Sequence, residues 1–150
     1  MQDRFETFTV LINRINRNIR RIKSQEIAAF QLKSAHISCL YHLYRADGLT
    51  ATDLCERCEE DKAAVSRSLD YLEKNGYLVC SSQQAKRYKS PFSLTEKGRE
   101  VGREINDKIN RILDEVGTGM TREERLAFYR SLSVISDSLD VIANNLGKQG

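Results

Sequence analysis

The sequence predicts a mainly α-helical (α+β) protein with one β-hairpin. Apolar residues recur at helical spacing along most of its 150 residues. Two short helical patterns follow one another between residues 50 and 76, separated by an acidic break. Directly after them, from Tyr77 to Leu94, lie two short β-favouring runs around a polar and basic centre. Two short helices followed by such a hairpin form a winged helix-turn-helix.

The composition is that of a single globular domain. Hydrophobic residues make up 40% of the chain and charged residues 30%, with a net charge of +3. The N-terminus has no apolar signal core, and no run reaches membrane-spanning length. We therefore expect a cytoplasmic protein with no membrane partner. The four cysteines are then expected to be free thiols.

A long amphipathic helix is predicted from about residue 3 to residue 29. Its apolar residues are spaced alternately three and four apart, which makes a heptad seam. The seam consists of Phe5, Phe8, Ile12, Ile15, Ile19 and Ile22. A helix of this length is about 40 Å long, more than a small lobe can cover. We expect its seam to be buried partly within the chain and partly against a second subunit, through Phe5, Phe8, Ile12 and Ile15.

The next helices begin at recognisable capping residues. A helix is predicted from Ser34 to Ala46, and its amino end could receive a DNA phosphate. Thr50 can cap the following short helix, with Asp53 as its capping-box partner. Ser34 and Thr50, at the amino ends of these two helices, are both candidates for contact with DNA.

The second helix of the pair, from Asp61 to Asn75, has two chemically different sides. Val65, Leu69 and Leu72 form one apolar stripe, while the opposite side carries Lys62, Ala63, Ser66, Arg67 and Asp70. Asp61 is suited to cap this helix, and Gly76 to end it. An arginine can fork onto guanine, a serine can bond base or phosphate, and an alanine permits close approach. Lys62, Ala63, Ser66 and Arg67 are therefore predicted to contact DNA.

The hairpin has a cationic tip, formed by Lys86, Arg87, Tyr88 and Lys89. From Lys62 to Arg99 there are eight Lys or Arg against three acids, a local charge of +5. The positive charge thus coincides with the predicted reading helix and hairpin, as expected for a partner that is double-stranded DNA.

The C-terminal part repeats the pattern of the N-terminal helix. A helix is predicted from Glu96 to about Val116, and Thr121 with Glu124 forms a capping box that starts the last helix. Its seam consists of Leu132, Ile135, Leu139, Ile142 and Leu146. Apolar seams at both ends and a basic centre predict a homodimer. We expect one domain over 1–150, with a DNA-binding lobe at about 32–98 and dimerisation helices at about 1–31 and 99–150.

The central stretch resembles the MarR family of bacterial transcriptional regulators. The resemblance is carried by D-K-A-A-V-S-R-S-L-D-Y-L-E-K-N-G-Y-L from Asp61, by the basic hairpin, and by S-L-T-E-K-G-R-E from Ser93. It implies a winged-helix homodimer that binds a pseudo-palindromic operator, often released by a small-molecule effector or by oxidation. It also implies a minor-groove role for Arg87, with Lys86 as competitor. The acidic residue usual two positions earlier is replaced by Ala85.

Two other functions stay open at this point. The first is a winged-helix module that binds proteins rather than DNA. The second is a metal or redox sensor that uses Cys55, Cys58 or Cys80, or the set His36, Cys39 and His42. A structural zinc site usually needs two cysteine pairs, and this sequence has one, so core packing is the favoured interpretation of Cys55 and Cys58. We predict no metal or cofactor, and no enzyme activity.

Overall fold

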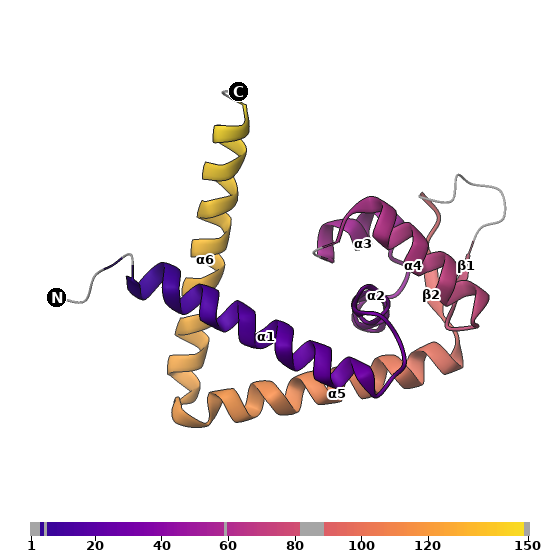
Figure 1. Cartoon of the computed structure of the whole chain (residues 1–150), viewed down its shortest axis with the longest axis horizontal. Coiled ribbons are helices and arrows are strands. Elements are labelled where there is room, and N and C mark those ends of the chain that lie inside the picture. Colours follow the sequence, from indigo (N-terminus) through magenta and orange to yellow (C-terminus); the bar gives the residue numbers. More distant parts are fainter. Residues whose placement is uncertain (1–3, 5, 59, 82–88, 149–150) are drawn as a thin grey trace. The chain divides into compact units, whose positions relative to one another are not determined.

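The computed structural model describes residues 4, 6–58, 60–81 and 89–148, and it is mainly helical with one small sheet (Figure 1). Its elements are η1 (Glu6–Val10), α1 (Leu11–Ala28), α2 (Ser34–Arg45), α3 (Ala51–Arg57), α4 (Lys62–Lys74), β1 (Leu78–Cys80), β2 (Phe92–Leu94), α5 (Glu96–Val116), η3 (Gly117–Gly119) and α6 (Arg122–Gly147). The predicted helix-turn-helix is α3 and α4, and the hairpin is β1 and β2. The first helix differs from the prediction, since the π-helical segment η1 precedes α1.

Contacts divide the chain into two compact units, residues 1–107 and 108–150. The first holds η1 to β2 and the start of α5. The second holds the end of α5, η3 and α6. No helix in the described parts of the chain is long and apolar enough to cross a membrane.

The core of the first unit lies between α2, α3, α4 and the hairpin. In Figure 1, α2 is seen end-on, with α3 and α4 beside it. Leu40 of α2, Leu54 of α3, Leu69 and Leu72 of α4, and Phe92 of β2 are fully buried. Full burial of each such side chain contributes about 1.5–3 kcal/mol. The apolar stripe predicted on α4 therefore faces the core.

The predicted helix caps are confirmed. The Thr50 hydroxyl accepts a hydrogen bond from the Asp53 amide at 3.2 Å, and the Thr50 amide donates to the Asp53 carboxylate at 2.9 Å. The Asp61 carboxylate accepts from the Ala64 amide at 2.7 Å. These bonds satisfy amides that a helix start leaves without partners.

The end of α4 turns the chain into the hairpin. Gly76 has a φ of +76°, which glycine adopts without strain. The Tyr77 amide donates to the Leu72 carbonyl at 2.9 Å, and the Gly76 amide to the Glu73 carbonyl at 3.1 Å. This is the Schellman pattern, and it fixes the direction in which β1 leaves α4.

The hairpin is antiparallel, with Leu78 opposite Leu94 and Cys80 opposite Phe92. Phe92 also donates its amide hydrogen to the Leu49 carbonyl at 2.9 Å, so the segment before α3 extends the small sheet. Pro91, which has no amide hydrogen, uses its carbonyl to accept from Ser81 at 2.9 Å. This agrees with the edge position expected of a proline.

The start of α5 approaches the lobe so closely that two positions admit only glycine. A Cβ at Gly98 would overlap the backbone carbonyl of Tyr77, and one at Gly102 would overlap the side chain of Tyr44. Thr95 caps this helix, accepting from the Gly98 amide at 3.1 Å. Close backbone packing therefore joins α5 to the lobe.

The two apolar seams stay largely uncovered within one chain. Neither α1 nor α6 has a buried residue. Of the residues predicted for dimerisation, Phe8, Ile12, Ile15, Leu132, Leu139, Ile142 and Leu146 are exposed, Ile135 is half-buried, and Phe5 lies outside the described residues. Exposed fractions reach 53% at Ile15 and 67% at Leu146.

Replacing Gly98 with alanine tests the α5 contact. We expect Gly98→Ala to lower the free energy of unfolding by about 2 kcal/mol or more, because the obstacle is backbone that cannot move aside. Gly119→Ala is the matched control, since no atom lies within 4 Å of its added Cβ. Urea denaturation at one fixed protein concentration measures both. Equal stability of the two variants would contradict the packing described here.

Candidate nucleic-acid interface

The outer face of α4 is exposed and carries the predicted side chains. Lys62, Ala63, Ser66 and Arg67 are all exposed, while Val65 is completely buried on the opposite side. The helix packs against both α2 and α3. The four residues therefore form one solvent-facing surface on a helix that is fixed from behind, and we call these residues the reading face.

The two serines of α4 have different roles. Ser68 is buried, and its hydroxyl donates to the Ala64 carbonyl at 2.8 Å. Ser66 is exposed on the reading face. A hydroxyl can both donate and accept, so Ser66 can meet a base edge or a phosphate oxygen.

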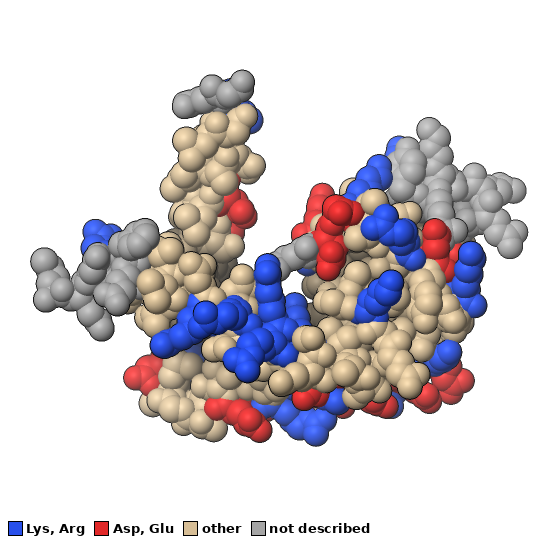
Figure 2. Space-filling model, viewed as in Figure 1, with Lys and Arg blue, Asp and Glu red and all other residues tan. Residues whose placement is uncertain are grey.

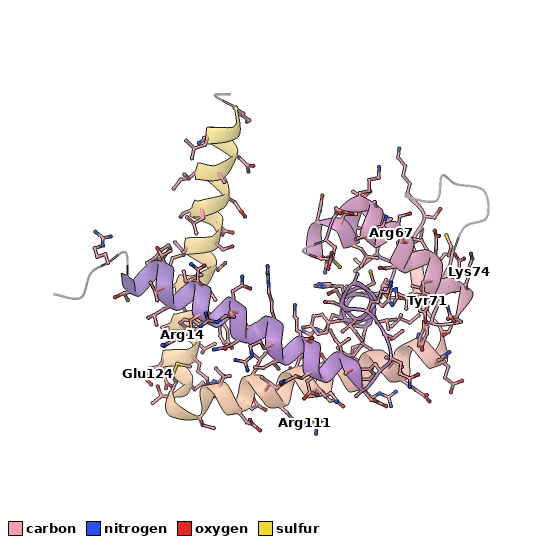
Figure 3. The ribbon with its side chains drawn as sticks, viewed as in Figure 1. Arg14, Arg67, Tyr71, Lys74, Arg111 and Glu124 are labelled. Carbon is pink, nitrogen blue, oxygen red and sulfur yellow. The ribbon has the colours of Figure 1, made fainter. Side chains whose placement is uncertain are left out.

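Two exposed residues of α4, Tyr71 and Lys74, were missed by the sequence analysis. They lie four and seven positions after Arg67, and Figure 3 shows all three along the same helix. Helical spacing from Arg67 would have identified both. Lys74 adds a cation and Tyr71 a phenol to the surface that continues the reading face.

Tyr71 also fixes α4 against α2. Its ring stacks on that of His36, with centroids 4.3 Å apart and planes 3° from parallel, and 41% of Tyr71 remains exposed. The Nδ1 of His36 accepts from the Lys33 amide at 3.2 Å and so caps α2. Burial lowers the pKa of His36, and the Lys33 cation lowers it further. His36 is thus held neutral, as its capping role requires.

The predicted phosphate contacts at Ser34 and Thr50 have different surroundings. Ser34 is exposed and is the first residue of α2, after the N-cap Lys33. The Thr50 hydroxyl donates to the Asp53 carboxylate at 2.8 Å. Thr50 could donate that hydrogen to a phosphate only if the capping box opened.

Of the predicted hairpin contacts, Lys89 is described and exposed. Lys86, Arg87 and Tyr88 lie outside the described residues. Figure 2 shows lysine and arginine side chains over the lobe that carries α4, and a further group over α1. The residues of that group include Arg14, Arg17, Arg20, Arg21 and Lys23, all exposed.

The cysteines and histidines do not gather around a common point. Among the described residues, no three His, Cys, Asp or Glu side chains form a group that could hold a metal ion. Cys58 is buried, as core packing predicts, but Cys55 is only half-buried, so the prediction is wrong for Cys55. Cys55 lines a cavity of about 380 Å³ between α3, α4 and β2. The lining residues are Ala51, Thr52, Cys55, Lys62, Ser66, Leu69 and Phe92.

The chain is similar to known regulators. Residues 30–87 match the model of the MarR family. An uncharacterised HTH-type transcriptional regulator of Bacillus subtilis, YwoH, is 27% identical over 121 residues, covering 79% of this chain and 88% of that protein. NMB1585, a MarR family regulator from Neisseria meningitidis, has a TM-score of 0.76 at 19% identity, over 96% and 99% of the two chains. MepR of Staphylococcus aureus in complex with DNA has a TM-score of 0.73 at 20% identity, over 88% and 97%. The predicted fold is confirmed.

The depressed histidine pKa values predict a loss of stability in acid. Burial lowers the pKa of both His36 and His42, so the unfolded chain takes up protons more readily than the folded one. Stability is then complete above the ordinary histidine pKa of about 6.5 and is lost as the pH falls below it.

Denaturation midpoints at about pH 7.5 and about pH 5.5 measure this effect. His36→Gln keeps an acceptor for the Lys33 amide but cannot titrate, so we expect it to lose less stability on acidification than the native chain. His42→Gln removes the smaller contribution of the more exposed imidazole. An unchanged pH dependence in both variants would contradict the assignment.

Proposed function

Because the chain belongs to the MarR family of transcriptional regulators, we propose that it is a repressor that binds a pseudo-palindromic operator as a homodimer. One observation carries the proposal: α4 presents Lys62, Ser66 and Arg67 to solvent while its other side is buried in the core. A helix held in this way can enter a major groove without reordering, so its side chains meet the base edges at little entropic cost.

The contacts divide into base-reading and positioning groups. Arg67 can bond guanine in a bidentate manner, Ser66 can bond a base edge, and Ala63 lets the helix approach closely. Lys62 and the hairpin residues Lys86, Arg87, Tyr88 and Lys89 would contact phosphates or the minor groove. Ser34 and Thr50 would contact phosphates at helix starts. Affinity should then fall steeply with salt, because phosphate contacts release counterions.

Dimerisation would cover the two exposed seams. Contiguous apolar surface of this kind marks interaction sites in soluble proteins. The seams lie on α1 and α6, outside the lobe that carries α4, so an interface there leaves both reading faces free. A two-fold dimer would present its two α4 helices to successive major grooves about 34–36 Å apart, on an inverted repeat.

Release by a small ligand fits the cavity beside α4. Its floor is apolar, with Leu69 and Phe92, and Lys62 and Ser66 belong to its wall. A ligand there would touch two residues of the reading face, so ligand and DNA would compete. An apolar anion suits this lining, because its charge could pair with Lys62.

Arg67 and Lys89 test the division of the contacts. We expect Arg67→Ala to weaken binding to the operator by about 10- to 100-fold and to relax the base preference at one position, since a bidentate contact is lost. Lys89→Ala should weaken all sequences alike and reduce the salt slope by about 1. Arg103→Ala removes an exposed arginine of α5 and serves as control. Fluorescence anisotropy on operator and scrambled duplexes distinguishes these results, and equal effects of the first two changes would contradict the division.

A charge in the α6 seam tests the dimer. We expect Leu139→Asp to give a monomer with strongly weakened operator binding, because a buried carboxylate without a partner opposes association. Ser133→Asp adds the same charge on the side of α6 that carries Asp137 and Asp140, and it should remain dimeric. Sedimentation equilibrium measures both. A dimeric Leu139→Asp variant would exclude this seam as the interface.

A further inference from the structure

Two buried thiols meet behind the reading helix. Cys39 of α2 is 0% exposed and Cys58, the C-cap of α3, is 5% exposed. The thiol of Cys39 donates a hydrogen bond to the sulfur of Cys58. These sulfurs belong to different helices, and both helices also pack against α4.

We propose that Cys39 and Cys58 are an oxidisable pair, which a peroxide converts to a reversible disulfide that weakens DNA binding. The DNA consequence rests on the function proposed above, whereas the disulfide itself does not. The sequence analysis treated Cys58 as core packing and did not pair it with Cys39. The contact is between residues 19 positions apart on separate helices, so periodicity could not reveal it.

The hydrogen bond gives the two sulfurs different roles. It lowers the pKa of Cys58, whose thiolate accepts the bond, although burial acts in the opposite direction. The same bond raises the pKa of Cys39, and burial raises it further. Cys58 is therefore the group that ionises first, and the thiolate is the nucleophilic form of cysteine.

The reaction with hydrogen peroxide balances in two steps. The Cys58 thiolate attacks one peroxide oxygen, the O–O bond breaks, and the hydroxide that leaves takes up a proton to become water. Cys58 is now a sulfenic acid. The Cys39 sulfur then attacks the Cys58 sulfur, the S–O bond breaks, and the Cys39 proton leaves with the hydroxyl group as a second water. Two thiols have lost two electrons and two protons in total.

The new bond would act on the reading helix through the turn between α3 and α4. An S–S bond is about 2.05 Å long, much shorter than a thiol–thiol hydrogen bond, so the end of α3 must move toward α2. The Cys58 amide is bonded to the Leu54 carbonyl at 2.7 Å, which transmits the movement along α3. Asp61, the cap of α4, follows only three residues after Cys58.

The other two cysteines provide matched controls. Cys55 is half-buried one turn before Cys58 and lines the cavity on the α4 side, and burial raises its pKa. Cys80 lies on β1, with its thiol half-buried. Neither is the residue to which the Cys39 thiol donates, so neither should be required for the disulfide.

Peptide mapping of the oxidised native chain tests the pair directly. Cleavage after Lys and Arg puts the four cysteines into four separate peptides: residues 34–45, 46–57, 58–62 and 75–86. After treatment of the reduced full chain with hydrogen peroxide, we expect 34–45 joined to 58–62 without reductant and both peptides released by dithiothreitol. A bond between 46–57 and 58–62, a bond between subunits, or sulfinic acid in place of a disulfide would overturn the proposal.

Operator binding by the same samples tests the consequence. We expect oxidation to weaken binding about tenfold and dithiothreitol to restore it, in the native chain and in Cys55→Ala and Cys80→Ala, with no response in Cys39→Ala or Cys58→Ala. A mapped disulfide with unchanged affinity would overturn the regulatory part. If the reduced chain bound no DNA at all, the proposed function would fail, while the peptide map would still decide the disulfide.

Discussion

The burial of one side of α4 is the contact on which the rest of the structure depends. Leu69 and Leu72 lie in a core shared with α2, α3 and Phe92 of the hairpin. Because that side is fixed, the opposite side is fixed as well, and its Lys62, Ser66 and Arg67 face solvent. The Schellman turn at Gly76 and the close approach of Gly98 to Tyr77 then set where the hairpin and α5 leave the lobe. Recognition chemistry here follows from core packing.

The exposed seams extend this dependence to the partner subunit. A lone α4 could contact only a few base pairs, and specific affinity usually needs more contacts than one helix provides. The apolar residues of α1 and α6 have no cover within the chain, and hydrophobic burial is what commonly drives association. In the proposed dimer, the terminal helices would supply association and the central lobe would supply recognition.

Features encoded within one helical turn could be predicted from the sequence. The caps at Thr50 and Asp61 and the buried stripe of α4 follow from local residue types, and the structure has all of them. What could not be predicted depends on residues far apart in the chain. The His36–Tyr71 stack and the Cys39–Cys58 hydrogen bond each join two elements, and no spacing rule connects them. The half-exposed position of Cys55 depends likewise on how α3 and α4 leave a cavity between them.

The central claim is that two copies of the chain present two α4 reading faces together to one duplex. Selection of bound sequences from random DNA by the purified full chain tests it most directly. The account predicts enrichment of an inverted repeat whose half-sites are centred about one helical turn, 10–10.5 base pairs, apart. Enrichment of a single unrepeated half-site, or no enrichment at low salt, would contradict it.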